Sequence, residues 1–169
     1  MSVTPEADLV VRIIGFLNNI GIKVVLGDVA DETFLPGIEV VDGTLIVDKV
    51  KLKYPGDLLH EAGHLAVSPA LARTRLSGKV ELTEAVPHLV ELEAILWSYA
   101  ACRYLDIDPG VVFHEHGYHG RSEGILLNFQ MGLFLGVQGL EAAGMTLSPS
   151  EAAKSDLQPF PVMQKWLRD

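Results

Sequence analysis

The chain has 169 residues, of which 49% are hydrophobic and 21% are charged, a balance typical of a folded globular domain. This composition excludes a disordered or fibrous protein, and the length is sufficient for one domain with its own core. The formal net charge of −9 argues against nucleic-acid binding, because a surface that binds nucleic acid must be basic.

The first part of the chain predicts one helix followed by three short strands. Apolar residues recur at helical spacing from Thr4-Pro5, which is typical of a helix start, to Gly21, which ends the helix. The β-branched segment 22–26 predicts a strand. Segment 38–47 predicts a β-hairpin, because two apolar runs flank the two-residue turn Asp42-Gly43.

The remaining chain predicts mainly helices, joined by an irregular connection over residues 69–83. The expected helices cover 55–68, 84–104 and 122–140, with a short one around Trp166. This order of elements predicts an α+β fold with a small three-stranded antiparallel sheet and a bundle of helices. No linker divides the chain, so we expect a single domain over 1–169, with 105–169 as a C-terminal helical extension packed on it.

Residues 60–64 read His-Glu-Ala-Gly-His, the HExxH pattern, inside a predicted helix. Two histidines four residues apart lie on one face of a helix, so His60 and His64 can bind one zinc ion. Glu61 lies beside that face, where it can activate a metal-bound water for attack on a carbonyl. The alternative is an ordinary solvated helix face, which the apolar residues around the motif disfavour.

A catalytic zinc site usually has three protein ligands, and the third is sought downstream. On a helical wheel, Glu91 groups with the more polar side of the helix 84–104, whereas Glu93 lies in the middle of the apolar stripe. A lone buried carboxylate is costly unless a cation or donors satisfy it, so we expect Glu93 to be the third ligand. The alternative is an ion pair between Glu93 and an arginine such as Arg73 or Arg75.

The HEAGH motif, followed by Glu93-Ala94-x-x-Trp97-x-x-Ala100, resembles the ImmA/IrrE-type zinc metallopeptidase domain over roughly residues 5–105. Trp97 stands where that family usually has phenylalanine. The resemblance implies a compact gluzincin-like, or zincin-like, fold with His60, His64 and Glu93 as zinc ligands and Glu61 as general base. It also implies cleavage of regulatory proteins, such as repressors, in the bacterial cytoplasm.

Three of the six histidines lie in the segment 113–121. One interpretation is a solvated loop. The other is that a histidine or tyrosine of this segment donates a hydrogen bond to the oxyanion that forms during hydrolysis. We expect that at least one of His114, Tyr118 and His119 lies within reach of the open metal position and contributes to catalysis.

The favoured function is therefore a zinc-dependent hydrolase, a metallopeptidase that acts on a protein or peptide with Zn²⁺ as cofactor. The alternative is a zincin-like domain that binds metal as a sensor or protein-interaction module without turnover. Glu61 favours the enzyme, because a binding module needs no base beside its metal. Three glycines on the last long helix allow close packing, inside the domain by preference or against a second subunit in a homodimer: Gly132, Gly136 and Gly139.

Sequence features also predict where the protein resides. Cys102 is the only cysteine and cannot form an internal disulfide, which fits a reducing cytoplasm. The N-terminus lacks the basic and apolar regions of a signal peptide. The longest uncharged run, 124–140, is too short and too polar to span a membrane. We expect a cytoplasmic protein with no membrane partner.

Overall fold

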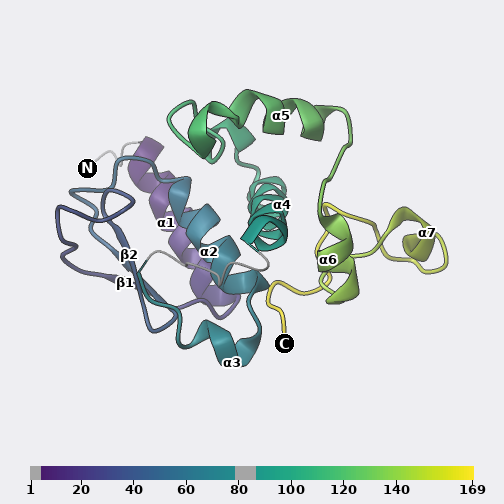
Figure 1. Cartoon of the computed structure of the whole chain (residues 1–169), viewed down its shortest axis with the longest axis horizontal. Helices are drawn as coiled ribbons and strands as arrows, with labels where there is room; N and C mark the ends of the chain where they lie inside the picture. Colours follow the sequence, from purple (N-terminus) through teal and green to yellow (C-terminus); the bar gives the residue numbers. More distant parts are fainter. Residues whose placement is uncertain (1–4, 79–86) are drawn as a thin grey trace.

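The computed structural model describes residues 5–78 and 87–169, which form a mixed α and β structure (Figure 1). Its elements, including two 3₁₀ turns named η, are α1 Pro5–Asn19, β1 Val24–Leu26, β2 Ile38–Val41, β3 Thr44–Val47, α2 Asp57–Val67, α3 Ala70–Arg73, α4 Pro87–Leu105, η1 Pro109–Val111, η2 Tyr118–Gly120, α5 Ser122–Gln130, α6 Val137–Ala142 and α7 Pro149–Ala152. The predicted α+β class is confirmed. Thr4 and residues 79–86, which include parts of the predicted connection and of the predicted helix 84–104, lie outside the described residues.

The helices α1, α2 and α4 occupy the middle of the molecule, between the sheet on one side and α5, α6 and α7 on the other (Figure 1). Buried apolar side chains from Val10 to Phe160 form one hydrophobic cluster through these layers. Leu58 and Leu65 of α2, Ile13 of α1 and Trp97 of α4 are completely buried. Burial of each such side chain contributes about 1.5–3 kcal/mol, which fixes α2 between its neighbours.

The sheet is mixed, which corrects the prediction of a fully antiparallel sheet. Strands β2 and β3 form the expected antiparallel hairpin, and both turn residues, Asp42 and Gly43, have positive φ, as the tight turn requires. Strand β1 instead pairs with β3 in parallel, in the order β1-β3-β2. The loop 27–37 is long enough to carry the chain past β3, so β2 becomes an edge strand.

Glycines allow the backbone of α2 to approach two other segments closely. A Cβ at Gly63 would lie 2.8 Å from the carbonyl oxygen of Ala94 on α4. A Cβ at Gly56, just before α2, would lie 2.1 Å from the carbonyl oxygen of Val111 in η1. Both distances are too short for any side chain, so these glycines set the position of α2 against α4 and η1.

The predicted helix 122–140 is interrupted and forms α5 and α6. Gly132 and Gly136 have positive φ angles of 71° and 92°, which break the helix between them. Gly136 and Gly139 pack α6 against α4 of the same chain, and a Cβ at Gly139 would lie 1.7 Å from Glu93 Oε1. Among the described residues, none of the helices has both the length and the apolar character needed to cross a membrane.

The segment after α7 packs along the helices without forming the short helix predicted around Trp166. The ring of Trp166 lies nearly perpendicular to those of Phe16 and Trp97, at centroid distances of 4.9 and 5.5 Å, and its carbonyl accepts a hydrogen bond from Trp97 Nε1. The backbone N–H of Arg168 bonds to the carbonyl of Ala66 on α2. The prediction failed because the backbone of this segment bonds to distant elements instead of to itself.

Candidate metal centre

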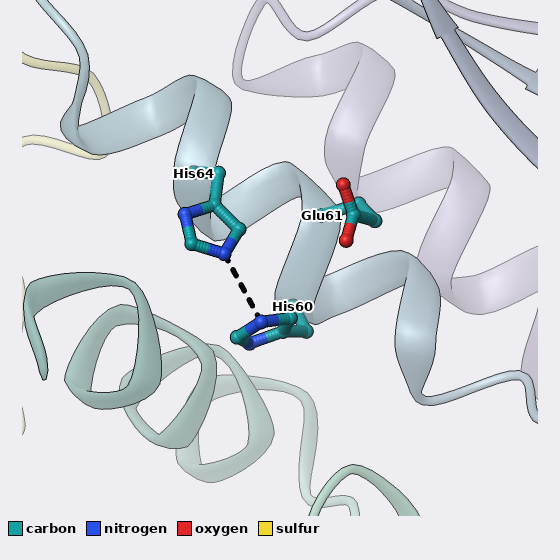
Figure 2. A group of neighbouring side chains, drawn as sticks. All are labelled: His60, Glu61 and His64. Atoms are coloured by element: carbon teal, nitrogen blue, oxygen red, sulfur yellow. Dashed lines mark hydrogen bonds between the residues drawn. The ribbon is translucent and has the colours of Figure 1, made fainter. Parts of the chain in front are cut away.

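The two histidines of α2 meet on one side of the helix (Figure 2). His60 Nε2 lies 3.1 Å from His64 Nε2, because residues four apart on a helix stack one above the other. One potential ligand atom from each of His60, Glu61 and His64 lies within 4.8 Å of the others. The structure therefore brings together the three residues of the motif in a group that can hold a metal ion.

Glu91 of α4 approaches the same two nitrogen atoms. Its carboxylate oxygens lie 3.1 Å from His64 Nε2 and 3.5 Å from His60 Nε2. Burial by itself would raise the pKa of Glu91, but the hydrogen bond with His64 and the two nearby imidazoles lower it below its usual value. Glu91 is thus an ionised carboxylate beside the histidine pair, and it takes the place expected for Glu93.

Glu93, the predicted third ligand, pairs with an arginine in this structure, and no contact between it and the histidine pair is seen among the described residues. Its Oε2 accepts a hydrogen bond of 2.8 Å from Arg168, which also donates to the carbonyl of Gly139. The alternative of an arginine ion pair is therefore the observed one, although the partner is neither Arg73 nor Arg75. The buried carboxylate is satisfied from the side of α4 that faces α6.

His60, His64 and Glu91 hold their polar atoms at separations that suit the ligands of one metal ion. In a tetrahedral site, two ligand atoms about 2 Å from the metal are about 3.3 Å apart. The two Nε2 atoms are 3.1 Å apart, and one Glu91 oxygen lies 3.1 Å from His64 Nε2 while the other lies 3.5 Å from His60 Nε2. Burial lowers the pKa of His60 to about 4, with a further contribution from His64, so the imidazole is neutral and can donate a lone pair. Two imidazoles and one carboxylate are a common ligand set of catalytic zinc.

Glu61 projects from a different side of α2 than the two imidazoles (Figure 2). Its side chain is almost fully buried, and burial raises its pKa above the usual value, with smaller contributions from Asp57 and Glu91. A carboxylate with a raised pKa is a better proton acceptor than one in water. Glu61 is thus a buried carboxylate of raised pKa with an oxygen within 4.8 Å of a ring nitrogen of each histidine.

Tyr118 is the one residue of the predicted segment 113–121 that contacts a histidine of the motif in the described structure. Its hydroxyl lies 3.0 Å from Nδ1 of His60, on the side of the ring away from His64. If Nε2 of His60 binds metal, Nδ1 carries the proton and donates it to the tyrosine oxygen, which fixes the ring orientation. Tyr118 and His119 both have positive φ, near 55°, a strained conformation that turns the tyrosine toward α2.

We expect Tyr118→Phe to weaken zinc binding by about 10- to 100-fold, since it removes the hydrogen bond that orients His60. Competition with a chromophoric chelator measures the affinity. The matched control is His119→Asn, because His119 is exposed and asparagine tolerates its left-handed backbone. Equal affinities for the two variants would show that the tyrosine hydroxyl does not orient the ligand.

The other two residues proposed for catalysis from this segment lie elsewhere. His114 stacks on Tyr54 with a centroid distance of 4.1 Å, and its Nε2 lies 3.0 Å from Asp57 Oδ1 at the start of α2. This pair anchors the segment to α2. His119 is exposed to solvent. Of these three residues, Tyr118 contacts the histidine pair, through Nδ1 of His60, and the expectation that one of them acts at an open metal position stays a prediction.

Sequence reasoning missed Glu91 because α4 is buried on nearly all sides and its apolar stripe does not mark the side that faces α2. The small residues of α4 indicate the side that faces α2. Ser98 lies on the wheel beside Glu91, is completely buried and donates a hydrogen bond to the carbonyl of Leu59 on α2. Small side chains mark the line of closest helix contact, and Glu91 continues that line.

Comparisons of this chain with models of protein families, with curated proteins and with solved structures found no match.

Proposed function

We propose that this chain is a zinc-dependent metallopeptidase in which His60, His64 and Glu91 hold the metal and Glu61 is the general base. The observation that supports this proposal is the convergence of two imidazole nitrogens and one ionised carboxylate, within 3.1 to 3.5 Å of one another, beside a buried carboxylate of raised pKa. The likeness of the HEAGH motif to ImmA/IrrE-type peptidases supports a protein or peptide as the substrate.

Each side chain then has a distinct task. His60 and His64 donate Nε2, and Glu91 adds a negative charge that partly balances the cation. A zinc ion bound there would supply Lewis acidity, polarising the substrate carbonyl and lowering the pKa of water to about 7. With Nε2 of His60 bound to metal, its Nδ1–H would donate to the Tyr118 oxygen, and burial raises the pKa of the tyrosine and leaves it a neutral phenol.

Glu61 moves the proton. In hydrolysis of a peptide bond, the oxygen of water bonds to the carbonyl carbon, the C–N bond breaks, and the leaving nitrogen gains a proton. The Glu61 carboxylate takes a proton from the attacking water and then gives it to that nitrogen, so the carboxylate is regenerated. Its burial suits the first step, because a raised pKa favours uptake of the proton.

The test combines metal content with hydrolysis. We expect about one zinc per chain by elemental analysis, little zinc in His64→Ala, and cleavage of an unfolded protein such as casein that stops with chelator and returns with added zinc. Zinc bound without cleavage would make the chain a non-catalytic metal-binding module. Equal zinc in the wild type and His64→Ala would show that the histidine pair is not the site.

A further inference from the structure

A cavity of about 260 Å³ lies beside Glu61, at strand β2, which is an edge strand of the sheet. Its lining is Glu32, Thr33, Phe34, Leu35, Ile38, Glu39, Val40, Glu61 and Gly78. A group bound in this cavity would lie next to the carboxylate that we propose as the general base. The cavity is therefore positioned to hold a part of the substrate close to the bond that is cleaved.

The backbone of β2 is already engaged along this edge. The N–H of Ile38 bonds to the carbonyl of Leu35, and the carbonyl of Val40 accepts a hydrogen bond of 2.8 Å from the N–H of Gly78. These two groups are unavailable to a substrate strand. Recognition here therefore depends on a side chain that enters the cavity more than on backbone pairing with β2.

The loop that forms one wall is held in place before any ligand binds. The carboxylate of Asp48 accepts hydrogen bonds from the backbone of Val29 and Val50, and Lys51 Nζ bonds to the carbonyl of Val29 and pairs with Asp31 at 2.6 Å. These contacts fix the start of the segment that continues to Glu32 and Leu35. A preformed wall lowers the entropic cost of binding a side chain.

The chemistry of the lining combines apolar surface with negative charge. Phe34, Leu35, Ile38 and Val40 supply apolar contacts. Every charged residue in the described lining is a glutamate, and the whole chain carries a net charge of −9. An acidic side chain would be repelled here, whereas a long aliphatic chain that ends in a cation matches both the apolar wall and the carboxylates.

We propose that this cavity binds a lysine or arginine side chain of the peptide substrate, with Glu32 and Glu39 facing its charge. This inference rests on the proposed peptidase function, and it assigns that function a substrate class. Glu32 is exposed and Glu39 is half-buried, so each contributes a screened attraction. Preference for a basic side chain comes from the combined attraction of Glu32, Glu39 and Glu61 for its positive charge, and from the repulsion of acidic side chains by the same carboxylates.

The test uses short alanine- and serine-based peptides that are identical except for one position. That position holds lysine, norleucine or glutamate and is moved along the peptide, and mass spectrometry of the products locates the bond cleaved by the zinc-loaded protein. Norleucine matches the aliphatic part of lysine without its charge. We expect cleavage at a fixed distance from the lysine, with kcat/KM about 10-fold above the norleucine peptide and no cleavage directed by glutamate.

Substitutions in the lining test whether the preference for lysine arises in the cavity. Glu32→Gln and Glu39→Gln should each lower the lysine-to-norleucine ratio of kcat/KM by about two- to fivefold, and high salt should lower it as well. Glu123→Gln, which removes the same charge from exposed surface on α5, should leave the ratio unchanged. A ratio near one, or one that Glu123→Gln lowers equally, would overturn the proposal even though peptides are cleaved.

A second measurement separates this proposal from the proposed function. If no peptide is cleaved, the same three peptides carrying a fluorescent label are titrated against the zinc-loaded protein, and binding is followed by anisotropy. Tighter binding of the lysine peptide that Glu32→Gln weakens would support the cavity and contradict the peptidase. Equal binding of the lysine, norleucine and glutamate peptides would overturn the cavity as a cation-selective site.

Discussion

Glu91→Ala is expected to weaken zinc binding by more than about 100-fold. Substitution of an outer residue that only orients a ligand typically costs 10- to 100-fold, and Glu91 would lose a direct bond to the metal. The carboxylate lies 3.1 Å from His64 Nε2, and its side chain is 42% exposed, so the variant should fold. Competition with a chromophoric chelator at fixed pH measures the affinity.

The matched control is Glu93→Gln, on the same helix but on the side that faces α6. This variant weakens the bond to Arg168 and should lower stability, whereas zinc affinity of the folded protein should change little. Circular dichroism before each titration confirms that the protein is folded. Loss of zinc from Glu93→Gln together with retention by Glu91→Ala would reverse the assignment of the third ligand.

Glu61→Gln should abolish peptide hydrolysis, with a loss of about 10²- to 10⁴-fold, and should retain zinc. Glutamine has nearly the same shape as glutamate but cannot take a proton from water. Because Glu61 is buried and its pKa is raised, the neutral amide should fit the site without destabilising it. Rates on the peptide series and elemental analysis of the same preparation give both quantities.

Glu61→Asp provides the comparison, since it keeps the carboxylate but moves it away from the substrate. Partial activity of the aspartate variant together with inactivity of the glutamine variant indicates proton transfer by the carboxylate. If Glu61→Gln loses zinc as well as activity, Glu61 is a ligand or a structural residue, and the group of three residues around His60 and His64 must be reinterpreted.

Local patterns in the sequence predicted the elements whose geometry is decided locally. The helix α1, the hairpin around Asp42-Gly43 and the helix α2 all form where expected. The parallel pairing of β1 was missed, because it depends on the path of the loop 27–37 and not on the strand itself. The break between α5 and α6 is not visible in the pattern, because a glycine that packs within a helix and a glycine that ends one with a positive φ, as Gly132 and Gly136 do, look alike in the sequence.

The candidate site was predictable to the extent that it lies on one helix. The spacing of His60 and His64 determines their convergence, so the motif alone was sufficient. The third carboxylate comes from another helix, and its choice depends on how α4 is rotated against α2. Glu91 and Glu93 point to different sides of α4, and the packing of α4 on α2, including the contacts of Gly63 with Ala94 and of Ser98 with Leu59, decides which side meets the histidines.

The contact at Gly63 also limits which sequences can carry this site. The two inner positions of an HExxH pattern are usually considered free, but here one of them touches the backbone of another helix. Even an alanine at that position would force the helices apart, at a cost of about 1–3 kcal/mol, and would shift Glu91 away from the histidines. Distant relatives of this protein are therefore best sought with glycine before the second histidine and a glutamate at the place of Glu91, a more selective pattern than HExxH alone.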